Sequence, residues 1–217
     1  MTTRGLNRDR LVRIAHDYVG EHGLDALTMR RLAAAVDVTP GALYKHVRDK
    51  RDLRRALADS VFATIALTDI DLARPDVDQV IVCFQRMRAA MLAFRDGGRI
   101  IAGSYSPFAA TAALGVTVRT LLAGIVLPEF DPGDIAYVLR NYTVGFVIEE
   151  QAYLALVDSG EWDELIRRPP TGAPTQAKRG SDAISILGDN RDRRFHAGLA
   201  AVLAGTVTSP RDTDHQR

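Results

Sequence analysis

A short stretch near the N-terminus combines cationic, hydroxyl, aromatic and very small side chains, which are the types that contact nucleic acid. An arginine such as Arg30 can donate two hydrogen bonds to one guanine in the major groove, whereas Tyr44, His46 and Lys50 carry donors suited to phosphate oxygens. Small residues allow a helix to approach base edges closely. The candidate DNA-contacting residues are therefore Thr28, Arg30, Thr39, Pro40, Gly41, Ala42, Tyr44, Lys45, His46 and Lys50.

Residues 27–50, LTMRRLAAAVDVTPGALYKHVRDK, predict the two short helices that would hold this set. Thr28 can cap the first helix, and the Thr-Pro pair at 39–40 can open the second with a capping hydroxyl and a proline at the first helical position. Leu43 and Val47 are four residues apart and therefore face inward. The arrangement predicts a helix-turn-helix, whose second helix enters the major groove of DNA. An ordinary helical hairpin within a larger bundle is the alternative.

The charge of the 217-residue chain is nearly balanced overall but uneven along its length. Residues 1–55 contain 12 Lys and Arg against 7 Asp and Glu, whereas the remainder contains 16 against 20. Such a distribution is expected when only one end of a protein contacts nucleic acid. The hydrophobic fraction of 47% is ordinary for a globular protein. The single Cys83 excludes an internal disulfide and favours core packing in a reducing compartment, the cytoplasm.

One apolar run, at residues 108–127, is about long enough to cross a bilayer. Arg119 lies near its middle, however, and a charge at the centre of a bilayer costs about 2.5 kcal/mol or more. No second apolar run accompanies it, and the charged N-terminal sequence MTTRGLNRDR does not have the pattern of a signal peptide. We therefore expect a buried helix in a bundle and no membrane partner.

Helical periodicity dominates the rest of the chain, and no alternating strand pattern exceeds a few residues. Apolar stripes and capping signals predict helices at 6–21, 49–67, 77–94, 134–158 and 192–206. The sequence Arg95-Asp96-Gly97-Gly98 predicts a helix end, with glycine in the left-handed conformation. We predict an all-α protein in which a loop at about 168–183 and a tail at 207–217 are flexible, because they hold few apolar residues.

The order of these parts resembles the tetracycline repressor (TetR) family of bacterial transcription regulators. The resemblance rests on LTMRRLAAAV, the turn, GALYKHV and the basic helix start DKRDLRRALAD, and the stretch LYKHVRDKRDL is specific. One departure is Asp37, at a turn position where the family usually has glycine; aspartate tolerates the left-handed conformation better than most residues. The resemblance implies an N-terminal three-helix DNA-binding domain at 1–50 and a helical effector-binding and dimerisation domain at 51–217.

Two further segments resemble the tetracycline-repressor branch of that family, AFRDGGRIIAG at 93–103 and NYTVGFVIEEQAYLAL at 141–156. In that branch the first ends a pocket-lining helix and begins a switch segment, and the second lines both the pocket and the dimer interface. The resemblance implies a homodimeric repressor that binds a palindromic double-stranded DNA operator and leaves it when a small-molecule effector binds. A dimeric DNA-binding regulator without an effector is the alternative.

The same resemblance predicts a change in effector chemistry. The histidine of the switch segment falls at Ile101 and its arginine neighbour at Tyr105, two drug-contacting polar positions fall at Ala66 and Cys83, and only an acidic group survives, as Glu149. Isoleucine cannot ligate Mg²⁺. We therefore predict that tetracycline–magnesium is not the inducer and that the effector is small and largely apolar or aromatic. The candidate effector residues, for each of which core packing is the alternative, are Cys83, Met87, Met91, Phe94, Ile101, Tyr105, Phe108, Tyr142, Phe146 and Glu149.

Signals for catalysis and metal binding are absent from the sequence. Glu149 and Glu150 are adjacent on a predicted helix and point about 100° apart, so they do not form a carboxylate pair. The five histidines show no zinc-binding spacing with one another or with Cys83, and neither a nucleophile elbow nor a phosphate-binding glycine loop is present. We expect no enzyme activity, no metal site and no cofactor. A helical small-molecule carrier or enzyme is the rival class.

Overall fold

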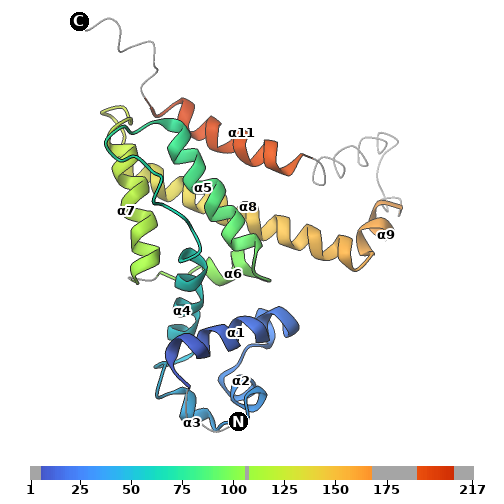
Figure 1. Ribbon diagram of the computed structural model, residues 1–217. Coiled ribbons are helices and arrows are strands. Elements are labelled where there is room, and N and C mark those ends of the chain that lie inside the picture. The colour runs from blue at the N-terminus through green and yellow to red at the C-terminus, as the bar shows by residue number, and fades with distance from the viewer. Residues whose placement is uncertain (1–5, 106–107, 168–189, 208–217) are drawn as a thin grey trace, which may run out of the picture.

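The computed structural model describes residues 6–105, 108–167 and 190–207, and all three ranges are largely helical (Figure 1). The predicted all-α fold with an N-terminal helix-turn-helix is therefore confirmed. Within these ranges the extended pairing is limited to one antiparallel bridge, between Val126 and Val207. The predicted loop at 168–183 and the predicted tail beyond Val207 lie outside the described residues.

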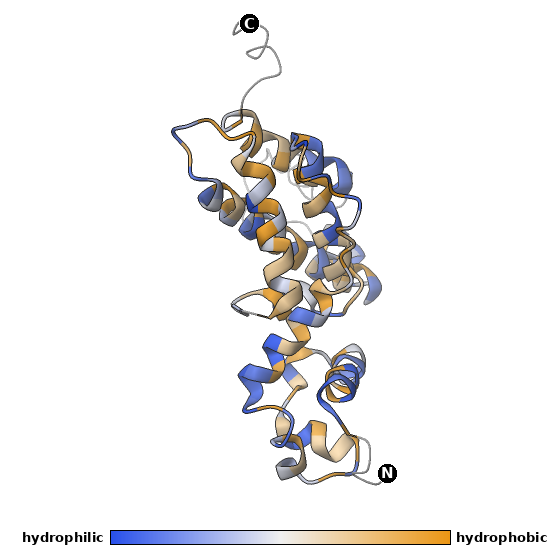
Figure 2. Ribbon diagram, turned by 60° about the vertical axis from the view of Figure 1, so that its left-hand side comes forward, coloured by the Kyte–Doolittle hydropathy of each residue, from blue (hydrophilic) through white to orange (hydrophobic). Residues whose placement is uncertain are grey.

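The N-terminal helices form a small unit at one end of the molecule, which we call the head (Figure 1). It contains α1 (Arg8–His22), the short 3-10 helix η1 (Leu24–Ala26), α2 (Met29–Ala35) and α3 (Pro40–Leu43). Leu11, Ala15 and Val19 recur on one side of α1 and are buried, together with Leu32 of α2 and Leu43 of α3. In Figure 2, hydrophilic residues accordingly lie on the outer sides of these helices.

The remaining helices form the body, and α4 runs into it from the head (Figure 1). Its elements are α4 (Lys50–Phe62), α5 (Val77–Leu92), α6 (Gly97–Ile101), α7 (Ala109–Ala123), α8 (Pro132–Asp158), α9 (Glu161–Arg167) and α11 (Arg191–Ala204). The sequence did not predict η1, α6 or α9, and α4 ends before the predicted boundary at residue 67. Helix α8 packs against α5, α6, α7 and α11 and is the central element of the body.

Side-chain caps determine where several helices begin. The Thr28 hydroxyl accepts a hydrogen bond from the Arg31 backbone N–H at 3.1 Å, and the Asp49 carboxylate accepts one from the Asp52 N–H at 2.7 Å. Both caps agree with the predicted helix starts. Asp131 accepts from Gly133 N–H and from the next residue, which fixes the start of α8.

The corner between α5 and α6 differs from the prediction. The left-handed residue is Asp96, with φ of 58°, and not a glycine. Gly97 and Gly98 instead begin α6 and are buried. A Cβ atom on Gly97 would overlap the Met91 carbonyl oxygen, and one on Gly98 would crowd Ile148. The glycines are therefore required by close packing of α6 on α5 and α8, whereas Asp96 takes the left-handed conformation and forms an ion pair with Arg99 at 2.9 Å.

Helix α7, predicted to be a buried helix, is buried on one side only. Leu114, Val118 and Leu121 face the core, whereas Val116 is 65% exposed and Arg119 is also exposed. The apolar run at residues 108–127 thus covers the core without being enclosed by it. Among the described residues, no helix combines the length and the apolar character needed to cross a membrane.

Candidate DNA-binding face and effector cavity

The candidate DNA-contacting residues lie on and around α2 and α3, at the end of the head away from the body (Figure 1). Leu32, Leu43 and Val47 are buried in the head, which turns the polar side chains outward. The exposed members of the predicted set are Thr28, Arg30, Thr39, Pro40, Gly41, Tyr44, Lys45 and Lys50, and the half-buried members are Ala42 and His46. The fold therefore presents the predicted cationic and hydroxyl groups at one end of the molecule.

The turn between α2 and α3 closes despite the departure at Asp37. Asp37 adopts φ of 51°, the left-handed conformation that the sequence predicted for this position. The Val38 backbone N–H then donates to the Ala33 carbonyl at 3.0 Å. The turn geometry is thus retained with a residue that has a side chain.

The start and length of the second helix differ from the prediction. Thr39 occupies the cap position in an extended conformation, but its side chain makes no capping hydrogen bond. The helix contains only residues Pro40–Leu43, so Tyr44, Lys45 and His46 lie in the turn that follows it rather than on its outer face. The Thr39 hydroxyl and these three side chains are consequently not held by regular helical structure.

An ion pair that the sequence did not predict connects the head to α4. Asp52, which is only 4% exposed, accepts hydrogen bonds from Arg8 Nη2 at 2.9 Å and Arg8 Nη1 at 3.2 Å. It also accepts from the Arg48 backbone N–H at 2.9 Å, while Arg8 Nη1 donates to the His46 carbonyl at 2.9 Å. The Arg8 guanidinium lowers the pKa of Asp52 to about 2. Helix α1 is therefore connected both to α4 and to the turn that bears the DNA-contacting groups.

Three charged residues of the α5–α6 corner contact the head. The Asp96 carboxylate accepts a hydrogen bond from the Leu24 N–H at 2.8 Å, and Arg99 forms an ion pair with Asp25 at 2.6 Å. Arg95 Nη1 donates to two carbonyl oxygens, those of residues 20 and 21, at the end of α1. Because these carbonyls have no partner inside the helix, a cation at this end is favourable. The corner thus connects the body to the end of α1 and to η1.

Gln151 of α8 supports the same corner from the body side. Its Oε1 accepts a hydrogen bond from the Gly98 N–H at 3.0 Å, and its Nε2 donates to the Phe94 carbonyl at 2.8 Å. A half-buried amide can satisfy both a donor and an acceptor in this way. Gln151 therefore fixes the position of the α5–α6 corner relative to α8.

A cavity of about 280 Å³ lies between α4, α5, α7 and α8. Its walls are mostly apolar, as expected for a small-molecule site. The residues that line it are Phe62, Phe84, Met87, Thr111, Leu114, Gly115, Val118, Arg119, Gly133, Ala136, Tyr137 and Arg140. Of the predicted effector residues, Met87 lines this cavity. Phe62 and Phe84 could have been identified only as core residues, because nothing in the sequence distinguishes a cavity wall from a packed interior.

The cavity touches the helix that carries the head. Phe62 is the last residue of α4 and lines the cavity wall. Three residues earlier, the Asp59 carboxylate accepts hydrogen bonds from the Thr111 N–H at 2.8 Å and the Thr111 hydroxyl at 2.9 Å. Thr111 lies in the first turn of α7 and also lines the cavity. A molecule in the cavity would therefore contact both helices of the α4–α7 connection, α4 through Phe62 and α7 through Thr111.

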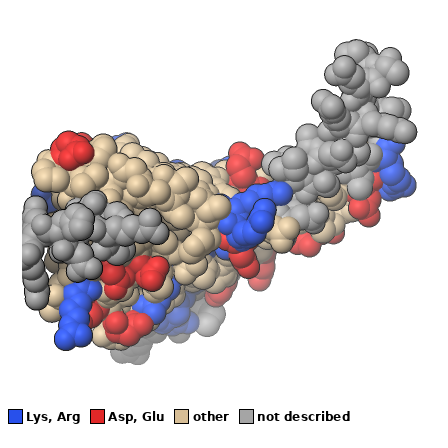
Figure 3. Space-filling model, turned by 90° about the horizontal axis from the view of Figure 1, so that it is seen from above, with Lys and Arg blue, Asp and Glu red and all other residues tan. Residues whose placement is uncertain are grey.

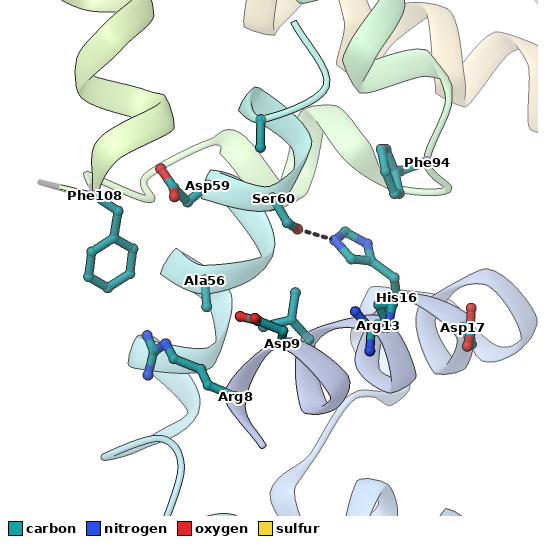
Figure 4. Close-up of a pocket in the computed structure, with 12 residues that line it drawn as sticks. Arg8, Asp9, Arg13, His16, Asp17, Ala56, Asp59, Ser60, Phe94 and Phe108 are labelled. Carbon is teal, nitrogen blue, oxygen red and sulfur yellow. Dashed lines mark hydrogen bonds between the residues drawn. The ribbon is translucent and has the colours of Figure 1, made fainter. Parts of the chain in front are cut away.

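Two other predicted effector residues, Phe94 and Phe108, lie at a second cavity, of about 600 Å³, between α1, α4 and the body (Figure 4). His16 and Ser60 both line this cavity, and their side chains are joined by a hydrogen bond of 2.7 Å. The Ser60 hydroxyl donates to the Leu57 carbonyl, so His16 Nε2–H is the donor in this pair. Burial lowers the pKa of His16, which keeps the ring neutral near pH 7.

Tyr142, Phe146 and Glu149 line a third hollow, an apolar groove of about 570 Å³ formed by α8, α9 and α11, which we call the α8–α11 groove. Here the structure separates the two adjacent acids: Glu149 is exposed, whereas Glu150 is buried and accepts two hydrogen bonds from Arg88, at 2.6 and 2.7 Å. Neither carboxylate lines the 280 Å³ cavity. Viewed from the side opposite the head, the surface includes a broad area without charged side chains (Figure 3).

The remaining predicted effector residues line none of these three hollows. Cys83, Met91 and Ile101 are completely buried in the core, and burial raises the pKa of the Cys83 thiol to about 11. Tyr105 is 68% exposed, with the Arg140 guanidinium 5.8 Å from the centre of its ring. The predicted effector set is thus divided among one cavity, two other hollows, the core and the surface.

Comparison with known proteins identifies the family. The family model "Bacterial regulatory proteins, tetR family" matches residues 11–57, and "Tetracyclin repressor-like, C-terminal domain" matches residues 77–209. The chain is 34% identical over 204 residues to tetracycline repressor protein class A from transposon 1721 of Escherichia coli, with 92% of this chain and 90% of that protein covered. This chain belongs to the TetR family.

Solved structures of TetR-family proteins share the whole arrangement. A possible TetR family regulator from Streptomyces coelicolor A3(2) is 30% identical, with a TM-score of 0.72 over 92% of this chain and 98% of that one. BioQ bound to its double-stranded DNA operator is 25% identical, with a TM-score of 0.60 over 91% of this chain and 99% of that one. The likeness thus includes both the head and the body.

Membership of the TetR family confirms the predicted class of protein, a DNA-binding transcriptional regulator and not an enzyme. Among the described residues, no three or more His, Cys, Asp or Glu side chains are grouped so that they could hold a metal ion. Several ionisable groups have structural roles, in ion pairs such as that of Arg8 with Asp52 and in helix caps such as Asp49.

Proposed function

We propose that this TetR-family protein is a cytoplasmic homodimeric repressor, which binds a palindromic operator and leaves it when a small, largely apolar or aromatic effector occupies the 280 Å³ cavity. Residues 1–50 form the DNA-binding domain in this proposal, and the effector-binding and dimerisation domain begins at residue 51. The proposal of operator binding is supported by the structure of BioQ on its operator. The proposal of an effector-responsive repressor is supported by the relative named as a tetracycline repressor.

The observation that carries this proposal is the contact between the cavity and α4. A ligand that packs against Phe62 and Thr111 alters the surroundings of the helix that enters the head. A core without a cavity would favour the alternative, a regulator without an effector. This body instead contains the 280 Å³ cavity beside α4, the helix that enters the head. For a tenfold release of DNA, the effector must prefer the released state by about 1.4 kcal/mol.

Within the part of the chain that the structure describes, a partly exposed apolar side of α8 supports the homodimer. Helix α8 has 27 residues and buries Ile135, Leu139 and Val147 on one side. An apolar side chain also occurs on its outer side, where Val138 is 46% exposed. With α11 alongside, the α8–α11 groove offers an apolar surface for the same two helices of a second subunit. A twofold dimer would hold two heads for two half-sites of a palindrome.

The chemistry of the cavity supports an effector other than tetracycline–magnesium. Ile101 is a buried apolar residue, and Glu149 lines the α8–α11 groove rather than the cavity. Hard oxygen ligands are what Mg²⁺ requires. We therefore expect calorimetric titration with tetracycline to show no Mg²⁺-dependent binding. Magnesium-dependent binding with a Kd in the micromolar range or below would contradict this part of the proposal.

The DNA-binding proposal is tested by fluorescence anisotropy on the intergenic DNA that flanks the protein's own gene. A scrambled duplex serves as the control, and both are measured over a series of salt concentrations. We expect tight binding to the native duplex only, with two protomers per site. Failure to bind either duplex at low salt would contradict the proposal.

Two substitutions separate base reading from phosphate contact. We expect Arg30→Ala to cost about 1–3 kcal/mol on the operator and to relax preference at one base pair per half-site. Lys50→Ala should instead weaken all sequences alike and reduce the salt dependence. Arg74→Ala, at an exposed residue of the body, is the matched control and should change neither property. Equal effects of Arg30→Ala on operator and scrambled DNA would rule out its role in base reading.

A further inference from the structure

The charges around the 280 Å³ cavity all have one sign. Its ionisable lining residues other than Tyr137 are two arginines, Arg119 on α7 and Arg140 on α8. No aspartate or glutamate lines it. The two helices that form one side of the cavity therefore each contribute a guanidinium, which is always protonated and carries several hydrogen-bond donors.

Other arginines of the body are already engaged by carboxylates. Arg86 pairs with Asp69 at 2.6 Å, and Arg88 pairs with Glu150 at 2.6 Å. Within the described ranges, by contrast, neither Arg119 nor Arg140 has an ion pair with a carboxylate. The guanidinium of Arg140 lies 5.8 Å from the centre of the Tyr105 ring, and this contact leaves its N–H donors available.

The carboxylates that hydrogen-bond to residues of the cavity wall are used in structural contacts. Asp59 directs Oδ1 at the backbone N–H and the hydroxyl of Thr111, and it does not line the cavity. Asp131 and Asp134 lie at the start of α8, where Asp131 caps the helix. An anion in the cavity would consequently meet donors and positive charge, beside apolar walls that strengthen the attraction.

We propose that the effector is an amphipathic organic carboxylate, with a flat apolar or aromatic body and one acidic group. The body would pack against Phe62, Phe84 and Met87, whereas the carboxylate would accept hydrogen bonds from Arg119 or Arg140. A guanidinium matches a carboxylate through two parallel N–H donors. This inference rests on the proposed function and specifies the chemical class that the same cavity recognises.

The proposal is tested by calorimetric titration of the DNA-free dimer with matched aryl acids and amides. The pairs are 2-naphthoate with 2-naphthamide, trans-cinnamate with cinnamamide, and 4-biphenylcarboxylate with its amide. Members of a pair have nearly equal size and differ in charge. We expect at least one acid to bind about fivefold or more tightly than its amide, and this preference should fall as salt rises.

Substitutions assign the preference to the two arginines. In the double variant Arg119→Gln/Arg140→Gln, the affinity ratio of acid to amide should fall to about one, while the affinity for the amide stays unchanged. The control Arg74→Gln removes one exposed charge elsewhere and should preserve the ratio. Gly115 lines the cavity with open space at its Cβ position, so Gly115→Leu should weaken acid and amide alike.

Three results would overturn the inference. They are amides that bind as tightly as their acids, an acid preference that survives in the double variant, and no binding of any acid up to about 1 mM. Since these titrations contain no DNA, any of them can occur while operator binding is intact. Loss of the proposed function would instead appear as a failure to bind the operator in the anisotropy experiment.

Discussion

At the scale of single residues, the carboxylate of Asp52 connects α4 to α1 and to the segment that precedes α4. It receives two hydrogen bonds from Arg8 of α1 and one from the backbone at Arg48, and it lies in the first turn of α4. The sequence predicted only that a helix starts near residue 49, because helix capping is a local signal. Arg8 lies 44 residues earlier, and no periodicity or spacing relates two positions that the fold brings together.

Replacing this carboxylate should make the head less stable in a pH-dependent way. The pKa of Asp52 is about 2 in the folded chain, below its usual 3.8. Its contribution is therefore complete above about pH 4 and is lost as the pH falls toward 2. We expect Asp52→Asn to lower the free energy of unfolding by about 1–2 kcal/mol at pH 7 and by less at pH 3.

Urea unfolding followed by circular dichroism measures this difference at the two pH values. Asp17→Asn, at an exposed carboxylate on α1, is the control and should have little effect at either pH. An Asp52→Asn deficit that is equally large at pH 3 and pH 7 would show that the loss is steric rather than electrostatic.

At the scale of helices, the sequence was most informative where capping residues and apolar stripes coincide. Helix α8 ends at Asp158, as predicted, and it begins at Pro132, after the Asp131 cap and close to the predicted start at residue 134. The prediction for the α5–α6 corner was wrong in detail, partly because Gly98 packs against Ile148 of α8, a helix that begins more than 30 residues later. Effector residues were hardest to assign, since helical periodicity identifies buried positions but not which of them border a cavity.

The contact between α8 and α11 also depends on a glycine. A Cβ atom on Gly198 would overlap the Tyr142 hydroxyl, which donates to the carbonyls of Arg194 and Phe195 at 3.2 and 3.3 Å. Although alanine favours helices, Gly198→Ala should destabilise the protein by about 1–3 kcal/mol because α11 must move. Thermal unfolding measures the change.

Gly20→Ala, in α1, is the control for Gly198→Ala, because it makes the same change in a helix without a close neighbour. Nothing lies within 4 Å of a Cβ atom at Gly20, on the exposed side of α1. This substitution should therefore stabilise the protein by about 0.5–1 kcal/mol, through helix propensity alone. Stabilisation by both substitutions would show that α11 does not require close approach to Tyr142.

At the scale of the whole molecule, the proposed dimer explains why apolar side chains remain on the outside of the body. Leu156 lines the α8–α11 groove and is half-buried in the single chain, so a charge there is compatible with a folded subunit. We expect Leu156→Arg to halve the mass measured by light scattering and to reduce operator affinity at least tenfold, because two linked heads bind better than one.

The matched control is Leu72→Arg, at an exposed leucine between α4 and α5. It introduces the same charge outside the groove and should change neither mass nor affinity. A Leu156→Arg protein that remains dimeric would place the dimer interface elsewhere. The sequence predicted this interface only through family resemblance, since one chain contains no information about which exposed apolar residues a second copy covers.

The burial of Cys83 has a practical consequence for observing the regulator at work. Its thiol is inaccessible and holds its proton, with a pKa of about 11, and the chain has no other cysteine. A cysteine introduced at the exposed Lys45 would therefore take up a spin label alone, without any need to remove the native thiol. In a dimer the two labels, one on each head, give a single label-to-label distance. Pulsed electron paramagnetic resonance could follow this distance as candidate acids are added.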